Sequence, residues 1–147
     1  MGLRMRGASI AAALMLSAAC TGQAGAQVDG TFQGTWALQS EPYSAGAGTV
    51  AIMSGVAVMR PESSGYAIQL LINELVTQGA QSVTITARET CRGAMDGAQF
   101  NITCEMAEPL EGYAPDTFVL QAGENADQLV GALVSSSSSQ VTFTRLR

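Results

Sequence analysis

Apolar and polar residues alternate with a period of two along most of the chain from Thr31 onward. Residues 31–39 show this clearly, because threonine and glutamine occupy one face and larger or apolar residues the other. The second face carries Phe32, Gly34, Trp36 and Leu38. Successive side chains of a β-strand point to opposite faces of the sheet, so the pattern predicts a strand with one buried face.

Further strand-like runs follow at regular spacing and are separated by turn-forming residues. They cover residues 50–59, 82–91, 100–106, 118–121, 129–134 and 141–147. Ser54-Gly55 interrupts the first of these runs and predicts a bulge or bend, and Asp96-Gly97 is a hairpin signal. The total of about eight short strands predicts an all-β fold, either a sandwich or a closed barrel.

Residues 66–78 fit two patterns. A helical stripe would be formed by Ile68, Leu71, Ile72 and Leu75. One face of a strand would be formed by Tyr66, Ile68, Leu70, Ile72 and Val76. We favour the strand, because residues 60–65 look like a hairpin turn and the neighbouring segments are all β. A helix over residues 66–78 would make the fold α+β.

The first 26 residues have the features of a bacterial signal peptide. Arg4 and Arg6 precede a small apolar stretch over residues 8–19, and Ala24-Gly25-Ala26 supplies a small-x-small cleavage pattern. The apolar stretch is shorter than the roughly 20 residues that a membrane span needs. We therefore expect export to the periplasm or the medium, with residues 1–26 removed and residues 27–147 forming a single β-barrel domain.

An alternative lies in the same segment. Residues 16–20, which end in Cys20, resemble a bacterial lipoprotein box. This resemblance implies that Cys20 is lipidated and becomes the first mature residue of an outer-membrane lipoprotein. Apart from this anchor we expect no contact with a membrane.

The other two cysteines form a candidate structural pair. Cys20 is either removed or acylated, which leaves Cys91 and Cys104 in an oxidising compartment. Both cysteines lie on the apolar face of their predicted strands, and the Asp96-Gly97 turn brings those strands together. We predict a Cys91–Cys104 disulfide with a structural role, since a redox pair would favour a Cys-x-x-Cys spacing and exposed thiols.

Composition removes several classes of function. The chain has no His, and its seven basic residues are all Arg, which excludes histidine-based nucleophile systems, imidazole metal sites and lysine Schiff-base chemistry. A net charge of −5 without basic clusters argues against nucleic acid as a partner. We expect no enzyme activity, no metal and no cofactor.

Four acidic residues fall close together in the sequence, and their spacing matches no metal or catalytic motif. They are Glu105, Glu108, Glu111 and Asp116. Because Pro109 and Pro115 lie among them, we interpret this stretch as a solvated loop.

Gly34-Thr35-Trp36 on the first strand and Arg145 on the last are the clearest family signal. Here the sequence resembles the lipocalin and avidin (calycin) group, in which such residues meet at the closed end of an eight-stranded up-and-down barrel. The resemblance implies that Gly34, Trp36 and Arg145 form a barrel-closure signature, with the guanidinium stacked on the indole. The interior of such a barrel would hold a small apolar ligand or be filled by core residues. Those residues are Phe32, Trp36, Ile85, Phe100, Ile102, Phe118 and Phe143.

A second resemblance is to periplasmic metalloprotease inhibitors, which share a small exported barrel, the Gly-x-Trp and one disulfide. It implies that residues 27–30 would enter a protease cleft. The sequence therefore predicts an exported, non-enzymatic β-barrel that binds a small apolar ligand. The alternatives are a module that binds an envelope protein, such as a protease inhibitor, and a structural lipoprotein of the envelope.

Overall fold

The computed structural model describes residues 30–136 and 138–147. The predicted signal peptide, the cleavage site and Cys20 lie outside these residues. A short 3-10 helix, η1 (Gly30–Phe32), precedes nine strands. These are β1 (Gly34–Ser40), β2 (Tyr43–Gly46), β3 (Thr49–Glu62), β4 (Gly65–Gln78), β5 (Gln81–Asp96), β6 (Gln99–Met106), β7 (Thr117–Ala122), β8 (Gln128–Leu133) and β9 (Ser139–Arg145).

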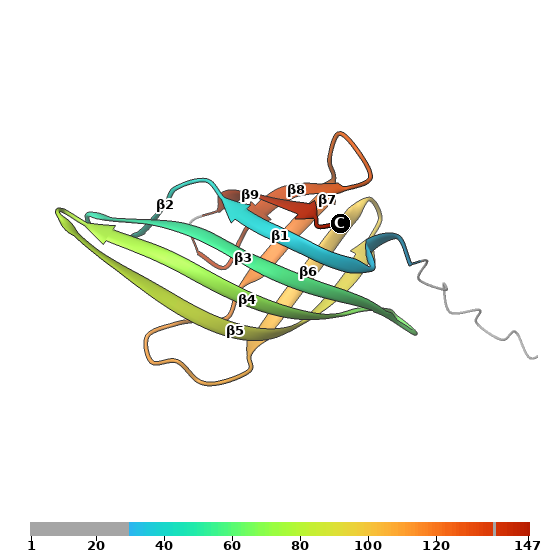
Figure 1. Cartoon of the computed structure of the whole chain (residues 1–147), viewed down its shortest axis with the longest axis horizontal. Helices are drawn as coiled ribbons and strands as arrows, with labels where there is room; N and C mark the ends of the chain where they lie inside the picture. The colour runs from blue at the N-terminus through green and yellow to red at the C-terminus, as the bar shows by residue number, and fades with distance from the viewer. Residues whose placement is uncertain (1–29, 137) are drawn as a thin grey trace, which may run out of the picture.

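The strands form a closed antiparallel barrel (Figure 1). Neighbouring strands pair in chain order from β3 to β9, and β1 closes the barrel by pairing with both β9 and β3. β2 continues the line of β1 along β3, because β1 pairs with residues 54–59 of β3 and β2 pairs with residues 49–51. The barrel wall therefore has eight strands, as the sequence predicts, and the sandwich alternative is wrong.

Residues 66–78 belong to a strand, and the helical alternative is wrong. Every residue of β4 has a partner in the ladder with β3, and nearly all pair with β5 as well. Leu71 and Leu75, which a helix would have buried with Ile68 and Ile72, are 42% and 44% exposed on the outside of the barrel. Pairing on both sides decides the conformation of a segment whose local pattern fits either structure.

β3 runs through Ser54-Gly55 without any shift of register against β1 or β4, so the expected bulge is wrong. Gly55 instead allows two strands to approach closely. A Cβ atom at this position would lie 2.4 Å from the carbonyl oxygen of Leu71 on β4.

One end of the barrel is filled with aromatic side chains. Phe118 and Phe143 pack edge to face with ring centroids 5.5 Å apart, and Phe32 packs on Phe100 at 4.6 Å. A Cβ atom on Gly93 would lie 2.4 Å from the Phe100 ring, so this glycine makes room for the aromatic side chain. Core aromatic residues thus fill the part of the interior that a ligand would need at this end.

The two ends of the barrel differ. η1 and the C-terminus lie at the filled end, and we call the opposite end the open end (Figure 1). There β3, β4 and β5 extend beyond the other strands, and β6 pairs with β5 only from Glu89 onward. Ile85, which the sequence places in the core, lies on this extension and is only half-buried.

Candidate functional site

Trp36, Arg145 and Gly34 meet at the filled end, where the resemblance to calycins places them. The Arg145 guanidinium carbon lies 4.3 Å from the centroid of the Trp36 ring. Arg145 also donates hydrogen bonds to the carbonyl oxygens of Gln33 and Thr31, and Trp36 Nε1 donates to that of Phe32 at 3.0 Å. Gly34 has a φ of +133°, and a Cβ there would lie 3.1 Å from Arg145 Nη1. These contacts join β1 to β9 and close the barrel.

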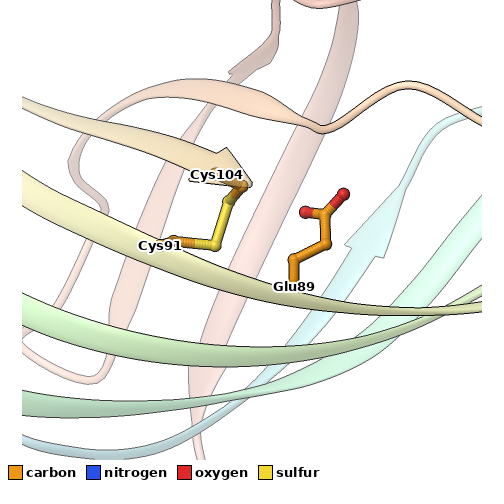
Figure 2. A group of neighbouring side chains, drawn as sticks. All are labelled: Glu89, Cys91 and Cys104. Atoms are coloured by element: carbon orange, nitrogen blue, oxygen red, sulfur yellow. A yellow bond between two sulfur atoms is a disulfide. The ribbon is translucent and has the colours of Figure 1, made fainter. Parts of the chain in front are cut away.

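The predicted disulfide is confirmed. Cys91 and Cys104 are directly opposite each other on β5 and β6, and their Cα atoms are 4.0 Å apart (Figure 2). The Cys104 N–H donates to the carbonyl oxygen of Asp116 and so faces β7 rather than β5. The two cysteines therefore form a non-hydrogen-bonded pair, the arrangement that brings opposite side chains closest. Both are buried, as a structural crosslink requires.

Three carboxyl groups lie inside the barrel between the disulfide and the open end, and we call them the acidic cluster. Glu74 on β4 is 9% exposed, Glu89 on β5 is 2% exposed, and Asp116, just before β7, is 5% exposed. Glu74 and Glu89 occupy inward positions of strands whose other inward residues are mostly apolar. Burial of three acids in so small a domain is costly and calls for compensating contacts.

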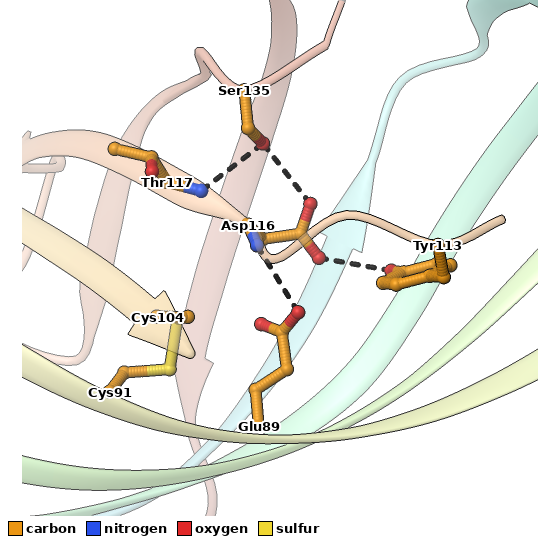
Figure 3. The surroundings of a disulfide bond; sticks show 7 residues. All are labelled: Glu89, Cys91, Cys104, Tyr113, Asp116, Thr117 and Ser135. Atoms are coloured by element: carbon orange, nitrogen blue, oxygen red, sulfur yellow. Dashed lines mark hydrogen bonds between the residues drawn. A yellow bond between two sulfur atoms is a disulfide. The ribbon is translucent and has the colours of Figure 1, made fainter. Parts of the chain in front are cut away.

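Hydrogen bonds connect the acidic cluster to its surroundings, and Figure 3 shows those of Glu89 and Asp116. Glu89 Oε1 accepts from the Asp116 N–H at 3.1 Å, and Tyr113 donates to Asp116 Oδ2 at 3.0 Å. Ser135 donates to Asp116 Oδ1 at 3.2 Å, and the Tyr43 hydroxyl donates to Glu74 Oε1 at 2.6 Å. Every donor in these contacts is electrically neutral, so they orient the carboxyl groups without neutralising them.

The second oxygen of Glu89 has no such contact. Glu89 Oε2 is buried and has no hydrogen-bond partner among the described residues. Figure 3 shows this carboxyl group pointing from β5 towards Asp116. A buried polar atom without a partner typically costs about 1–3 kcal/mol, which makes it an acceptor position that a donor from outside the chain could fill.

Burial changes the acidity of these groups. Removal from water, together with the nearby Asp116 charge, raises the pKa of Glu89 to about 7. Burial also raises the pKa of Asp116 to about 6, although its hydrogen bonds from Tyr113 and Ser135 oppose the change. Burial, reinforced by the neighbouring acids, raises the pKa of the Tyr43 and Tyr113 hydroxyls above their usual range. Glu89 and Asp116 therefore exchange protons near neutral pH, and the tyrosines remain neutral donors.

The arginines do not compensate for the acidic cluster. Arg88 pairs with Glu108 at 3.9 Å and Arg92 with Glu62 at 3.5 Å, both on the outer surface. Arg145 and Arg147 pair with Asp127 at the filled end, and Arg60 is exposed. The part of the chain that the structure describes thus places no basic side chain against these three carboxyl groups.

A hollow of about 500 Å³ lies at the open end, and we call it the mouth hollow. Its lining residues are Thr49, Val76, Gln78, Gln81, Ser82 and Val83. Except for Ser82, these residues occupy inward-facing positions of their strands. The hollow therefore lies on the inner face of the part of β3, β4 and β5 that extends beyond the other strands. Glu74 is the next inward residue below Val76, and Tyr43 lies opposite Ala51, the partner of Val76. The Tyr43–Glu74 pair therefore lies next to the lining residues of the mouth hollow, one inward position deeper in the barrel.

The sequence interpretation missed two members of the acidic cluster and misplaced the third. Glu108 and Glu111 are exposed in the loop after β6, as expected, whereas Glu105 is exposed on the outward face of β6 itself. Asp116 is not solvated, because the bond from its own N–H to Glu89 and its bonds from Tyr113 and Ser135 hold it inside the barrel. The alternation of inward and outward positions could have identified Glu74 and Glu89, because each occupies an inward position between apolar inward neighbours.

The structure offers little support for a metal ion. Among the described residues, one group of metal-type ligand atoms lies within 4.8 Å of one another, and it consists of Glu89, Cys91 and Cys104. Figure 2 shows these side chains, and the two sulfur atoms are bonded to each other, so neither is a thiolate that could bind a metal.

Within the described residues, no helix is long and apolar enough to cross a membrane. Comparison of this chain with protein-family models, with curated proteins and with solved structures finds no match.

Proposed function

We propose that this chain is an exported, non-enzymatic β-barrel protein that binds one small molecule at its open end. The observation that carries this proposal is the difference between the two ends of the barrel. Aromatic side chains fill the end near Trp36, whereas the other end has an inward-facing hollow above buried polar groups. A concave, mainly apolar site with a few oriented polar groups is the usual form of a small-molecule site.

The calycin resemblance supports this proposal, whereas the packing of the barrel interior determines where the ligand would lie. An eight-stranded barrel is just wide enough either to be filled by side chains or to hold one small ligand. Here the interior around Phe100, Phe118 and Phe143 is fully buried and packed. The ligand would therefore occupy the mouth hollow and would not reach Trp36.

Native mass spectrometry of the protein purified from cells that produce it tests this function. We expect a population whose mass exceeds that of the polypeptide by one defined small molecule, which dissociates when the protein is unfolded. A matched sample in which Val76 and Val83 are replaced by Gln should lose the adduct while keeping its fold. A clean apo mass for the parent protein would count against a ligand carrier.

A protein-binding module is the second candidate, and one observation favours it. Apolar side chains line the outer face of β3 and β4 next to one another in the ladder. They are Val50, Ile52, Val56, Leu71 and Leu75, each at least 38% exposed. Contiguous exposed apolar side chains often mark interaction sites. Recovery of a partner that is lost on Leu71→Ser, together with a clean apo mass, would favour this function over ligand binding.

A further inference from the structure

We propose that the acidic cluster recognises an organic cation, with the ammonium group of the ligand bound by carboxyl groups of the barrel interior and its apolar part in the mouth hollow. This inference rests on the proposed small-molecule binding function and specifies its chemical class. It would assign a binding role to Glu74, Glu89 and Asp116, the three acids that the structure buries.

The charge of the acidic cluster is not balanced by basic residues of the described part of the chain. Glu74, Glu89 and Asp116 are at most 9% exposed, and their hydrogen-bond donors are tyrosine and serine hydroxyls and a backbone N–H. The ion pairs of the described arginines involve Glu62, Glu108 and Asp127 instead. Buried charges in proteins are normally paired, so a cluster of one sign suits a ligand of the opposite sign.

Glu89 also has a buried acceptor oxygen without a partner among the described residues. Oε1 of Glu89 is used by the Asp116 N–H, whereas Oε2 is buried and has no partner in the described part of the chain. A protonated amine carries up to three N–H donors and forms stronger, charge-assisted hydrogen bonds with carboxylates than a neutral donor does.

The arrangement of the acidic cluster favours an organic cation over a metal ion. A metal ion needs several ligand atoms around one point, and the three carboxyl groups do not form such a group among the described residues. The carboxyl groups are spread along the barrel. Glu89 on β5 pairs with Leu70 on β4, and Leu70 is four residues from Glu74 on the same strand. A single ammonium group needs only one or two carboxyl groups as acceptors, so this arrangement suits an organic cation better than it suits a metal ion.

The mouth hollow accounts for the apolar part of the ligand. Val76 and Val83 are directly opposite each other in the ladder and lie one inward position nearer the rim than Glu74. Val83 is 58% exposed, although its position faces inward. An alkyl chain packed against these valines would gain about 25 cal/mol for each Å² of apolar surface that it removes from water. Glu74, the most exposed of the three acids, is the first carboxyl group that the ammonium group would meet.

Isothermal titration calorimetry with three probes of equal length tests the inference. The probes are n-octylammonium, n-octanol and n-octanoate, which share the alkyl chain and differ in charge. We expect n-octylammonium to bind at least tenfold more tightly than n-octanol, and n-octanoate to bind most weakly. Because all three can enter the mouth hollow, n-octanol measures the proposed binding function without the contribution of charge.

Matched variants locate the preference. Glu74→Gln and Asp116→Asn should reduce the preference for n-octylammonium over n-octanol to less than threefold. Glu105→Gln, which removes a charge from the outward face of β6, should leave the preference unchanged. Circular dichroism checks that each variant retains its β-sheet content.

The outcomes separate the two proposals. Equal binding of n-octanol and n-octylammonium would overturn the cation inference and leave the small-molecule function standing. A preference that survives both Glu74→Gln and Asp116→Asn would place the cation elsewhere and would also overturn it. Binding of none of the three probes would contradict the proposed function itself.

Discussion

Replacing Glu89 by Gln should change how the stability of the protein depends on pH. The amide side chain introduced by Glu89→Gln keeps an oxygen that accepts from the Asp116 N–H, and it places an uncharged nitrogen where the unpartnered Oε2 lies. The pKa of Glu89 is raised from 4.5 to about 7 in the folded protein. The folded protein thus binds this proton more tightly than the unfolded chain does.

The sign of the effect follows from proton binding. Where the folded state binds more protons than the unfolded state, the free energy of unfolding falls as the pH rises. The contribution of Glu89 is fully present below about pH 4.5 and is lost as the pH rises through about 7. Each tenfold change in proton affinity corresponds to about 1.4 kcal/mol, so the loss amounts to as much as about 3 kcal/mol.

The variant lacks this loss, because its amide does not ionise. At pH 8 we expect the Glu89→Gln variant to be more stable than the parent protein by about 1–3 kcal/mol, and at pH 4.5 the two should differ by less than about 1 kcal/mol. Asp116, whose pKa is raised to about 6, leaves a smaller decline in both proteins. For a domain of this size the difference at pH 8 is about 4–12 °C in Tm.

Urea and thermal unfolding at pH 4.5, 6 and 8 measure this dependence, with Glu105→Gln as the control for loss of one charge. Glu105 is exposed, so its replacement should shift the stability by less than about 0.5 kcal/mol. If Glu89→Gln shows the same decline in stability between pH 4.5 and 8 as the parent, Glu89 is not the source of the pH dependence. A variant that is less stable than the parent at every pH would mean that the carboxyl group has a structural role.

Three further predictions concern the frame of the barrel. Replacing Cys91 and Cys104 together by Ala should lower the free energy of unfolding in urea by about 3 kcal/mol, the value for a crosslinked loop of this length; an unchanged midpoint would contradict a structural disulfide. Gly93→Ala should cost about 1–3 kcal/mol in the same assay, since its Cβ would lie 2.4 Å from the Phe100 ring. Arg145→Gln should shift the fluorescence of Trp36 and lower Tm, whereas Arg88→Gln on the outer surface should change neither.

Much of the barrel could be predicted from the sequence because its strands obey a local rule. Period-two alternation places Trp36, Phe100 and Phe143 inward whatever the neighbouring strand is, so the wall of the barrel follows from the pattern. The disulfide can be predicted as well, because Cys91 and Cys104 lie on either side of a hairpin turn and on the same face of the two strands. The sequence alone does not decide between a helix and a strand over residues 66–78, because their pattern fits both the helical and the strand period. Pairing with β3 and β5 on both sides decides the conformation.

The acidic cluster could not be predicted from the sequence, because it depends on contacts between distant segments. Glu89 meets Asp116 across 27 residues, and Tyr43 meets Glu74 across 31. Parity alone marks Glu74 and Glu89 as inward, but it cannot show that strand extensions leave a hollow above them. Asp116 follows proline in a loop-like stretch, so its burial by Tyr113 and Ser135 has no local signal.

We propose that a small molecule binds at the open end of the barrel and not at the filled end. A titration with n-octylammonium followed by ¹H–¹⁵N correlation NMR tests it most directly, since each backbone amide reports its own surroundings. We expect the saturable chemical-shift changes to fall on residues 76–83 and on Tyr43, Glu74 and Asp116, with the Trp36 indole signal unchanged. Saturable changes confined to the Trp36 end or to the outer face around Leu71, or no saturable changes at all, would contradict it.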